Sequence, residues 1–155
     1  MARVFQCDIV TAEQQFYSGR VVSVVAPGIQ GELGIYGGHS ALITKLKPGV
    51  VRLGCDNVVS QESKQTCSEE QVETILYVSG GFLEVVPGTV TILAEQALRG
   101  QDIDEAAAQE AKRHAQELMT HPIRDMDYAR AVAQLAQAIA QIRALQEVRK
   151  LLGKG

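Results

Sequence analysis

The chain changes its residue usage sharply at about positions 99–102, and this change limits the fold more than any other feature. Before it lie 11 of the 14 glycines, three of the four prolines and most of the β-branched residues. After it, alanine and glutamine dominate. β-Branched residues with glycine and proline between them favour strands and turns, whereas alanine favours helices. The sequence therefore predicts two domains of different class, one over residues 1–100 and one over residues 101–155.

The first domain is predicted to be an antiparallel β-sandwich. Stretches rich in valine, isoleucine and leucine are separated by pairs such as Pro27 with Gly28 and Gly80 with Gly81, where the backbone turns. Many short stretches at close spacing favour a sandwich of about ten short strands over alternating strands and helices. The polar residues 55–71 are predicted to form a long hairpin loop. The clearest strands are expected at residues 4–10, 20–26, 41–45, 50–53, 73–78, 82–86 and 90–94.

The second domain is predicted to be an antiparallel hairpin of two helices. Asp102 is the expected N-cap of the first helix, because Glu105 follows three residues later as in a capping box. Pro122 ends this helix, and Asp125 or Asp127 caps the second. The short connection makes the helices neighbours. One face of the second helix is expected to be buried through Val132, Leu135, Ile139, Ile142 and Leu145.

The two predicted helices carry opposite charge. Residues 101–127 hold three Lys/Arg and seven Asp/Glu, a net of −4, whereas residues 128–155 hold five and one, a net of +4. Opposite charge favours a closed hairpin, although exposed pairs contribute only about 0–1 kcal/mol each. If the basic second helix is released, it suits an acidic protein surface.

Composition argues against several classes of protein. No stretch is apolar for the roughly 18 residues that a membrane span needs, and the first residues do not resemble a signal peptide. A net charge of −3 without tryptophan disfavours nucleic-acid binding. The cysteines and histidines lack metal-ligand spacing, so we expect no metal site and interpret Cys7, Cys55 and Cys67 as free thiols. The alternative is a Cys55–Cys67 bridge, which a reducing compartment opposes. Any link to a membrane is expected to run through partners.

The glycine-rich stretch 28–39 does not match a phosphate-binding loop. Its glycines recur every third residue from Gly28 to Gly37, but no Gly-Lys-Ser/Thr follows and the Gly-x-Gly-x-x-Gly order is missing. The chain also lacks a Gly-x-Ser-x-Gly elbow and a helical His-Glu-x-x-His motif. We therefore predict a non-catalytic protein, in which this loop packs closely on a neighbour and carries Glu32 and His39 as its polar features.

A resemblance to a known family extends this interpretation. Several segments, in one consistent order over nearly the whole chain, resemble the epsilon subunit of bacterial F-type ATP synthases, the complexes that couple proton transport to ATP synthesis. The resemblance implies a non-catalytic subunit of the central stalk. The segments that carry it are residues 10–19, 31–39, 46–49, 77–85, 90–94, 99–106, 127–128 and 135–143.

The same resemblance implies partners for each domain. The sandwich would bind the gamma subunit and the polar loops of the membrane ring of c subunits, and so transmit rotation. Thr11 would lie close to gamma, and Gly31, Glu32 and His39 would form the contact to gamma and the c-ring. The subunit would be peripheral on the cytoplasmic face of the bacterial inner membrane.

For the hairpin, the resemblance implies two positions, one folded on the sandwich and one extended into the catalytic head. Extension would inhibit ATP hydrolysis. In that state Arg143, Arg149 and Lys150 would face acidic segments of the alpha and beta subunits.

Some family members bind ATP on the folded hairpin, and this chain departs from their motif. The motif is Ile/Leu-Asp-x-x-Arg-Ala, and here Ile103 and Asp104 remain while Ala107 stands at the arginine position. Further arginine positions fall on His114, Gln137 and Gln141. Without these cations a triphosphate loses its charge-assisted hydrogen bonds, so we expect weak or absent ATP binding and no cofactor. The alternative function is a stand-alone β-sandwich binding module with a helical dimerisation tail.

Overall fold

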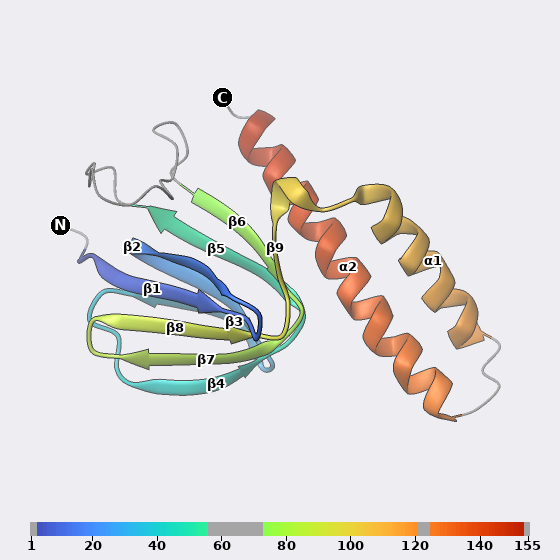
Figure 1. Ribbon diagram of the computed structural model, residues 1–155, viewed down its shortest axis with the longest axis horizontal. Helices are drawn as coiled ribbons and strands as arrows, with labels where there is room; N and C mark the ends of the chain where they lie inside the picture. Colours follow the sequence, from blue (N-terminus) through green and yellow to red (C-terminus); the bar gives the residue numbers. More distant parts are fainter. Residues whose placement is uncertain (1–2, 56–72, 121–124, 154–155) are drawn as a thin grey trace.

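The computed structural model describes residues 3–55, 73–120 and 125–153. Figure 1 shows a β-sandwich on one side and a pair of helices on the other, and the chain passes from one to the other close to residue 100. Most of the predicted loop over residues 55–71 and the connection between the helices lie outside the described residues. Both parts of the sequence have the fold class that their residue usage predicts.

Nine strands form the sandwich in the described part of the chain, against about ten expected. All seven predicted stretches are strands, and β3 and β9 were not expected. Residues 31–36 of the glycine-rich stretch form strand β3 and not a loop. Every residue of β3 pairs with the end of β2, and this pairing outweighs the low strand preference of glycine. The strands are β1 (Phe5–Val10), β2 (Gln15–Gly28), β3 (Gly31–Tyr36), β4 (Leu42–Leu46), β5 (Gly49–Cys55), β6 (Glu73–Val78), β7 (Gly81–Val86), β8 (Thr89–Ala94) and β9 (Ala97–Arg99).

The long strand β2 joins the two layers of the sandwich. Its first half pairs with β1, and its second half pairs with β3 and β5. One layer therefore runs β1, β8, β7, β4, and the other runs β3, β2, β5, β6, β9. The β1–β8 pair is parallel, and the other pairs between described strands are antiparallel.

Large aliphatic side chains from both layers fill the interior of the sandwich. Ile9, Leu53, Leu83 and Ile92 have no exposed surface. Each side chain of this size stabilises a fold by about 1.5–3 kcal/mol when it leaves water. The sandwich therefore has a core that is built without the helices.

The cysteines differ from the expectation of free thiols. Cys7 is free and belongs to the sandwich core, where burial and, to a smaller extent, the charge of Asp8 raise the pKa of its thiol to about 12. Cys55, at the end of β5, is disulfide-bonded, which corrects the interpretation of that residue as a free thiol.

A tight turn at Gly80 and Gly81 joins β6 to β7. Both residues have positive φ, 122° and 143°, a region in which other residues are strained. A Cβ on Gly81 would also lie 1.9 Å from the carbonyl oxygen of Leu93. This close approach allows Gly81, the first residue of β7, to pair with Ala94, the last residue of β8.

The first helix, α1 (Glu105–Thr120), is capped by Asp104 and not by Asp102. The Asp104 carboxylate accepts a hydrogen bond from the Ala107 amide at 3.1 Å. The predicted cap is wrong because Gly100–Asp102 form the short 3₁₀ turn η1, after which Ile103 is extended and buried. Burial of Ile103 thus delays the start of the helix by two residues relative to the capping-box pattern.

The second helix, α2 (Asp125–Gly153), lies between the sandwich and α1 (Figure 1). The predicted stripe is correct in part: Leu135, Ile142 and Leu145 are partly buried, whereas Val132 and Ile139 are 41% and 45% exposed. Since α2 packs on the sandwich and on α1 at once, its buried surface is divided between two faces, where small side chains allow close approach. Within residues 128–151 of α2, the buried residues are Ala131, Ala138, Ala140 and Ala144.

Candidate interaction surfaces

Three large apolar side chains are exposed together on the outer face of the β4–β7–β8 layer, and we call them the apolar patch. Ile43 is 73% exposed, Phe82 52% and Leu93 53%. Phe82 pairs with Lys45 on one side and with Leu93 on the other. Ile43 stands two residues from Lys45, so it lies on the same face. An exposed cluster of this kind is typical of a surface that contacts another protein.

The sheet becomes polar immediately beside the apolar patch. The row that contains Ile43 continues through Glu84 and Thr91 to Asp8. The Asp8 carboxylate accepts hydrogen bonds from the Ser18 hydroxyl at 2.7 Å and from the Gln6 amide at 2.8 Å. This polar network limits the apolar patch on one side.

The sequence interpretation missed the apolar patch, although a signal for it was present. A strand with one face in water normally alternates apolar and polar residues. Strand β7 instead carries Leu83 and Val85 on its inner face and Phe82 and Val86 on its outer face. Strand β7 is therefore apolar on the face that points away from the core as well as on the face that points into it. Apolar side chains on the outward face indicate that a protein partner covers it.

Three predicted contact residues lie along β3 and the turn that follows it. Glu32, near the start of β3, accepts a charged hydrogen bond from Arg52 Nη2 at 2.7 Å. His39 follows the other end of the strand, with its Nδ1 2.7 Å from the carbonyl oxygen of the next residue. Glu32 and the end of β3 are separated by roughly 13 Å, since a strand rises about 3.3 Å per residue. Gly31 and Glu32 are therefore neighbours, but His39 belongs to a different part of the surface.

Thr11 lies on the side of the sandwich that faces α2. Its hydroxyl donates to the Gln14 carbonyl at 3.1 Å and accepts from the Gln14 amide at 3.3 Å, which closes the turn between β1 and β2. Thr11 and Gln137 of α2 line the same hollow, with a volume of about 530 Å³. Thr11 thus lines a different hollow from Glu32, which lies in the cleft beside β5.

The contact between sandwich and hairpin is small and mostly apolar. Ile75, Tyr77 and Ile103 pack against Ala140 and Ala144 of α2. Partly buried residues surround this contact and complete it, among them Val50, Leu98, Leu145, Val148 and Leu151.

Tyr77 is the polar exception in this contact. Its side chain is fully buried, and its hydroxyl has no hydrogen-bond partner among the described residues. Burial raises the pKa of Tyr77, and the nearby Gln141 side chain on α2 offsets part of that rise without reaching hydrogen-bonding geometry. A buried hydroxyl without a partner costs about 1–3 kcal/mol.

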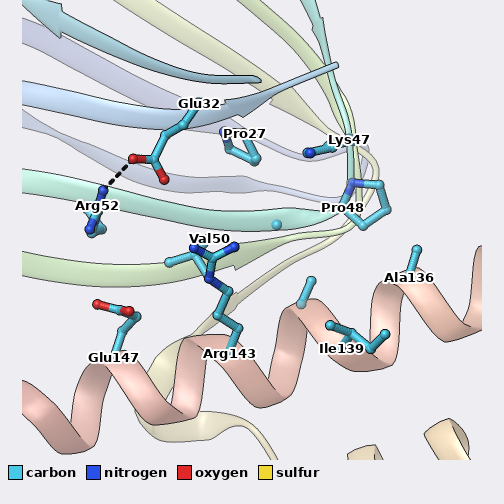
Figure 2. Close-up of a pocket in the computed structure, with 12 residues that line it drawn as sticks. Pro27, Glu32, Lys47, Pro48, Val50, Arg52, Ala136, Ile139, Arg143 and Glu147 are labelled. Atoms are coloured by element: carbon cyan, nitrogen blue, oxygen red, sulfur yellow. Dashed lines mark hydrogen bonds and ion pairs between the residues drawn. The ribbon is translucent and has the colours of Figure 1, made fainter. Parts of the chain in front are cut away.

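The three cations predicted to face the catalytic head lie in different surroundings. Arg149 forms an ion pair with Glu105 of α1, and Lys150 Nζ lies 3.5 Å from Glu147 Oε1. Arg143 is in no ion pair with any residue that the structure describes, and extends from α2 toward the sandwich (Figure 2). Two of the three are therefore engaged within the chain when the hairpin is folded.

The remnants of the nucleotide motif have structural roles. Ile103 is buried between the domains, and the Asp104 carboxylate caps α1. Ala107, at the arginine position, is exposed and offers no charge. In residues 3–55, 73–120 and 125–153 no cluster of three or more His, Cys, Asp or Glu side chains suits a metal ion. None of the described helices is long and apolar enough to span a membrane.

Together, these features define a protein of two parts, a β-sandwich that presents an apolar patch and a helical hairpin that packs against the sandwich. Residues 4–100 match the model of the ATP synthase delta/epsilon chain, beta-sandwich domain, and residues 101–146 match that of its long alpha-helix domain. The chain belongs to the ATP synthase delta/epsilon chain family. It is therefore a non-catalytic stalk subunit of F-type ATP synthase, and a peripheral subunit of that membrane-bound complex.

Two solved structures are similar to the chain in fold. One is from the Euglena gracilis mitochondrial ATP synthase, described as OSCP/F1/c-ring, with 18% identity and a TM-score of 0.76 over 94% of this chain and 82% of the other. The other is from the Tetrahymena thermophila mitochondrial ATP synthase, described as central stalk/c-ring, with 15% identity and a TM-score of 0.59 over 90% and 95%. The family assignment agrees with the resemblance in the sequence and not with the alternative of a stand-alone binding module.

Proposed function

We propose that this subunit couples the gamma subunit to the c-ring through residues 1–100 and inhibits ATP hydrolysis through residues 101–155. One observation carries the proposal: the sandwich has its own core and its own exposed apolar patch, while the hairpin rests on it through a small contact. In this proposal the sandwich makes the permanent contact with the rotor, and the hairpin makes the reversible contact.

The coupling role assigns a partner to the sandwich surfaces. The apolar patch suits gamma, because a contact that persists through rotation gains most from burying apolar area. Glu32 is exposed beside Gly31 and suits the polar c-ring loops, with Arg52 fixing its carboxylate. Thr11 and His39 lie elsewhere on the sandwich, so in this proposal they contact gamma at separate points. The description of the Tetrahymena complex as central stalk and c-ring supports this arrangement.

The inhibitory role requires the contact between the hairpin and the sandwich to open. Release of α2 exposes Ala140 and Ala144 together with the larger apolar side chains around them, and it frees the hydroxyl of Tyr77 to be hydrated. It also separates the exposed Arg149–Glu105 ion pair, which water largely compensates. Arg149 then becomes available, together with Arg143, to acidic segments of the alpha and beta subunits, and Lys150 reaches the same segments while its partner Glu147 moves with it on α2.

Two further parts of the proposal rest on the sequence motifs. ATP binding is weak or absent, because Ala107 supplies no cation and Asp104 caps α1. Isothermal calorimetry on the full chain is expected to give no micromolar dissociation constant. The location is the cytoplasmic face of a bacterial inner membrane, as in the resembling bacterial subunits; the two solved complexes named above are mitochondrial.

The coupling and inhibitory roles can be tested in the assembled complex. Deletion of residues 127–155 is expected to raise ATPase activity while the sandwich stays bound. Phe82→Asp in the full chain is expected to release the subunit from the complex, whereas Thr91→Asp, on the polar part of the same face, leaves it bound. Unchanged hydrolysis after the deletion contradicts the inhibitory role, and equal retention of the two Asp variants contradicts the assignment of the apolar patch.

A further inference from the structure

A cleft of about 410 Å³ lies between α2 and the sandwich, next to β2, β3 and β5. Figure 2 shows its two walls, with the strands above and α2 below. Both walls combine apolar and charged side chains, with apolar surface in moderate excess, and each wall carries at least one cation. The sandwich contributes Pro27, Lys47, Pro48 and Val50, and the hairpin contributes Ile139 and Arg143.

The charges in this cleft leave an unbalanced positive potential. The Glu32 carboxylate is paired with Arg52 at 2.7 Å, and the Glu147 carboxylate lies 3.5 Å from Lys150. Neither Lys47 nor Arg143 is in an ion pair with any residue in the described ranges. Both carboxylates are therefore partly neutralised, while two cations from opposite walls are free to attract an anion.

We propose that this cleft binds a small organic anion. Its carboxylate or phosphate group pairs with Arg143, whose guanidinium holds such groups through two parallel hydrogen bonds. Lys47 adds a second positive charge from the opposite wall. The apolar body of the ligand lies between Pro27 and Pro48 on one side and Ile139 on the other. Volume and lining agree with small-molecule sites, which are mostly apolar with a few polar groups.

This site is separate from the nucleotide motif of the family. The relevant motif positions on α2 are Gln137 and Gln141, and they face other surroundings. Gln137 lines the hollow beside Thr11, and Gln141 lies near Tyr77. The cleft is instead lined by α2 residues from Ala136 to Glu147 on another side of the helix.

The cleft exists only while the hairpin is folded on the sandwich, because each domain supplies one wall. A ligand that binds there stabilises the folded position and leaves the released hairpin unaffected. The inference does not depend on the inhibitory role, since binding is measured on the isolated full chain.

Three probes separate the parts of the proposed ligand: phenyl phosphate, inorganic phosphate and phenol. Phenyl phosphate is expected to shift the NMR signals of the Ile139 methyl groups in a saturable manner, with a dissociation constant on the order of 1 mM. Inorganic phosphate and phenol are each expected to bind about tenfold more weakly, since each lacks one of the two parts. Absence of saturation by phenyl phosphate, or equal binding of inorganic phosphate, overturns the proposal.

Substitutions on both walls test the assignment of the cations. Arg143→Gln is expected to weaken phenyl phosphate binding about tenfold, whereas Arg130→Gln, a matched change of an exposed arginine on the same helix, leaves it unchanged. Lys47→Gln weakens binding a few-fold without altering the hairpin, so it remains informative if Arg143→Gln disturbs α2. Equal affinity in all three variants contradicts the site.

Discussion

The sandwich and the hairpin bury different kinds of side chain. In the sandwich, residues such as Leu53, Leu83 and Ile92 meet from two layers without exposed surface. In the hairpin, the buried residues of α1 are Ala108 and Ala115, and those of α2 are also alanines. A buried methyl group contributes about 0.8 kcal/mol, against about 1.5–3 kcal/mol for a large aliphatic side chain. Each fully buried residue of the sandwich core therefore gains more from leaving water than each buried alanine of the hairpin.

The strongest test of this comparison removes bulk from the sandwich core. Ile92→Ala is expected to lower the free energy of unfolding by about 2–5 kcal/mol, because it leaves a cavity among fully buried neighbours. Leu93→Ala, on the adjacent residue that faces outward, is expected to cost less than about 1 kcal/mol. Urea unfolding followed by circular dichroism measures both. Similar losses for the two variants would mean that the core is less tightly packed than the burial indicates.

A smaller effect is expected where the hairpin meets the sandwich. Ala144→Leu places a larger side chain in a fully buried position and is expected to cost about 1–3 kcal/mol of docking free energy. Hydrogen exchange should then accelerate in α1 and α2 while the sandwich amides stay protected. Gln146→Leu, on the exposed side of the same helix, is the matched control. Faster hydrogen exchange in the sandwich as well would show that the two domains open together, and would contradict the difference between them.

The smallest effect is expected at the hydroxyl of Tyr77. Tyr77→Phe removes a buried polar group without a partner, so docking should strengthen by up to about 1 kcal/mol. Spin labels on the sandwich and α2 report the change as a distance distribution. A weaker docking in this variant would mean that the hydroxyl has a partner after all.

The same residue predicts a pH dependence. Because burial raises the pKa of Tyr77 above its ordinary value of 10.0, docking is fully favoured below pH 10 and weakens as the pH rises above it. Tyr77→Phe should remove this dependence. Tyr17→Phe should leave it in place, because burial and the Cys7 thiol raise the pKa of Tyr17 to about 12 within the sandwich core instead.

The fold class could be predicted from the sequence because local preferences and tertiary contacts agree over most of the chain. Alternating apolar residues between turn pairs identify seven strands. Prediction fails where a residue that is distant in the sequence determines the local structure. Strand β3 forms only because β2 pairs with it, and α1 starts at Glu105 because Ile103 is buried between domains. The spacing of apolar residues in α2 did not reveal that its buried surface is divided between the sandwich and α1.

The candidate surfaces were predictable only in part. The resemblance named Gly31, Glu32 and His39 together, since they lie close in sequence, but an extended strand separates His39 from the other two. The apolar patch was predictable in part, because β7 is apolar on both faces, but its other members depend on which strands are neighbours of β7. The cleft with Lys47 and Arg143 joins residues far apart in the chain, and it requires the hairpin to be folded.

The 14-residue length of β2 has a mechanical consequence for a subunit of a rotating stalk. Hydrogen bonds between strands run across the strand direction, so a force along β2 loads its bonds to β1, β3 and β5 in shear, many at once. The layer that carries the apolar patch and the layer that carries Glu32 share this single backbone. In the coupling role proposed above, torque therefore passes between the two layers through one continuous covalent backbone, with little compliance.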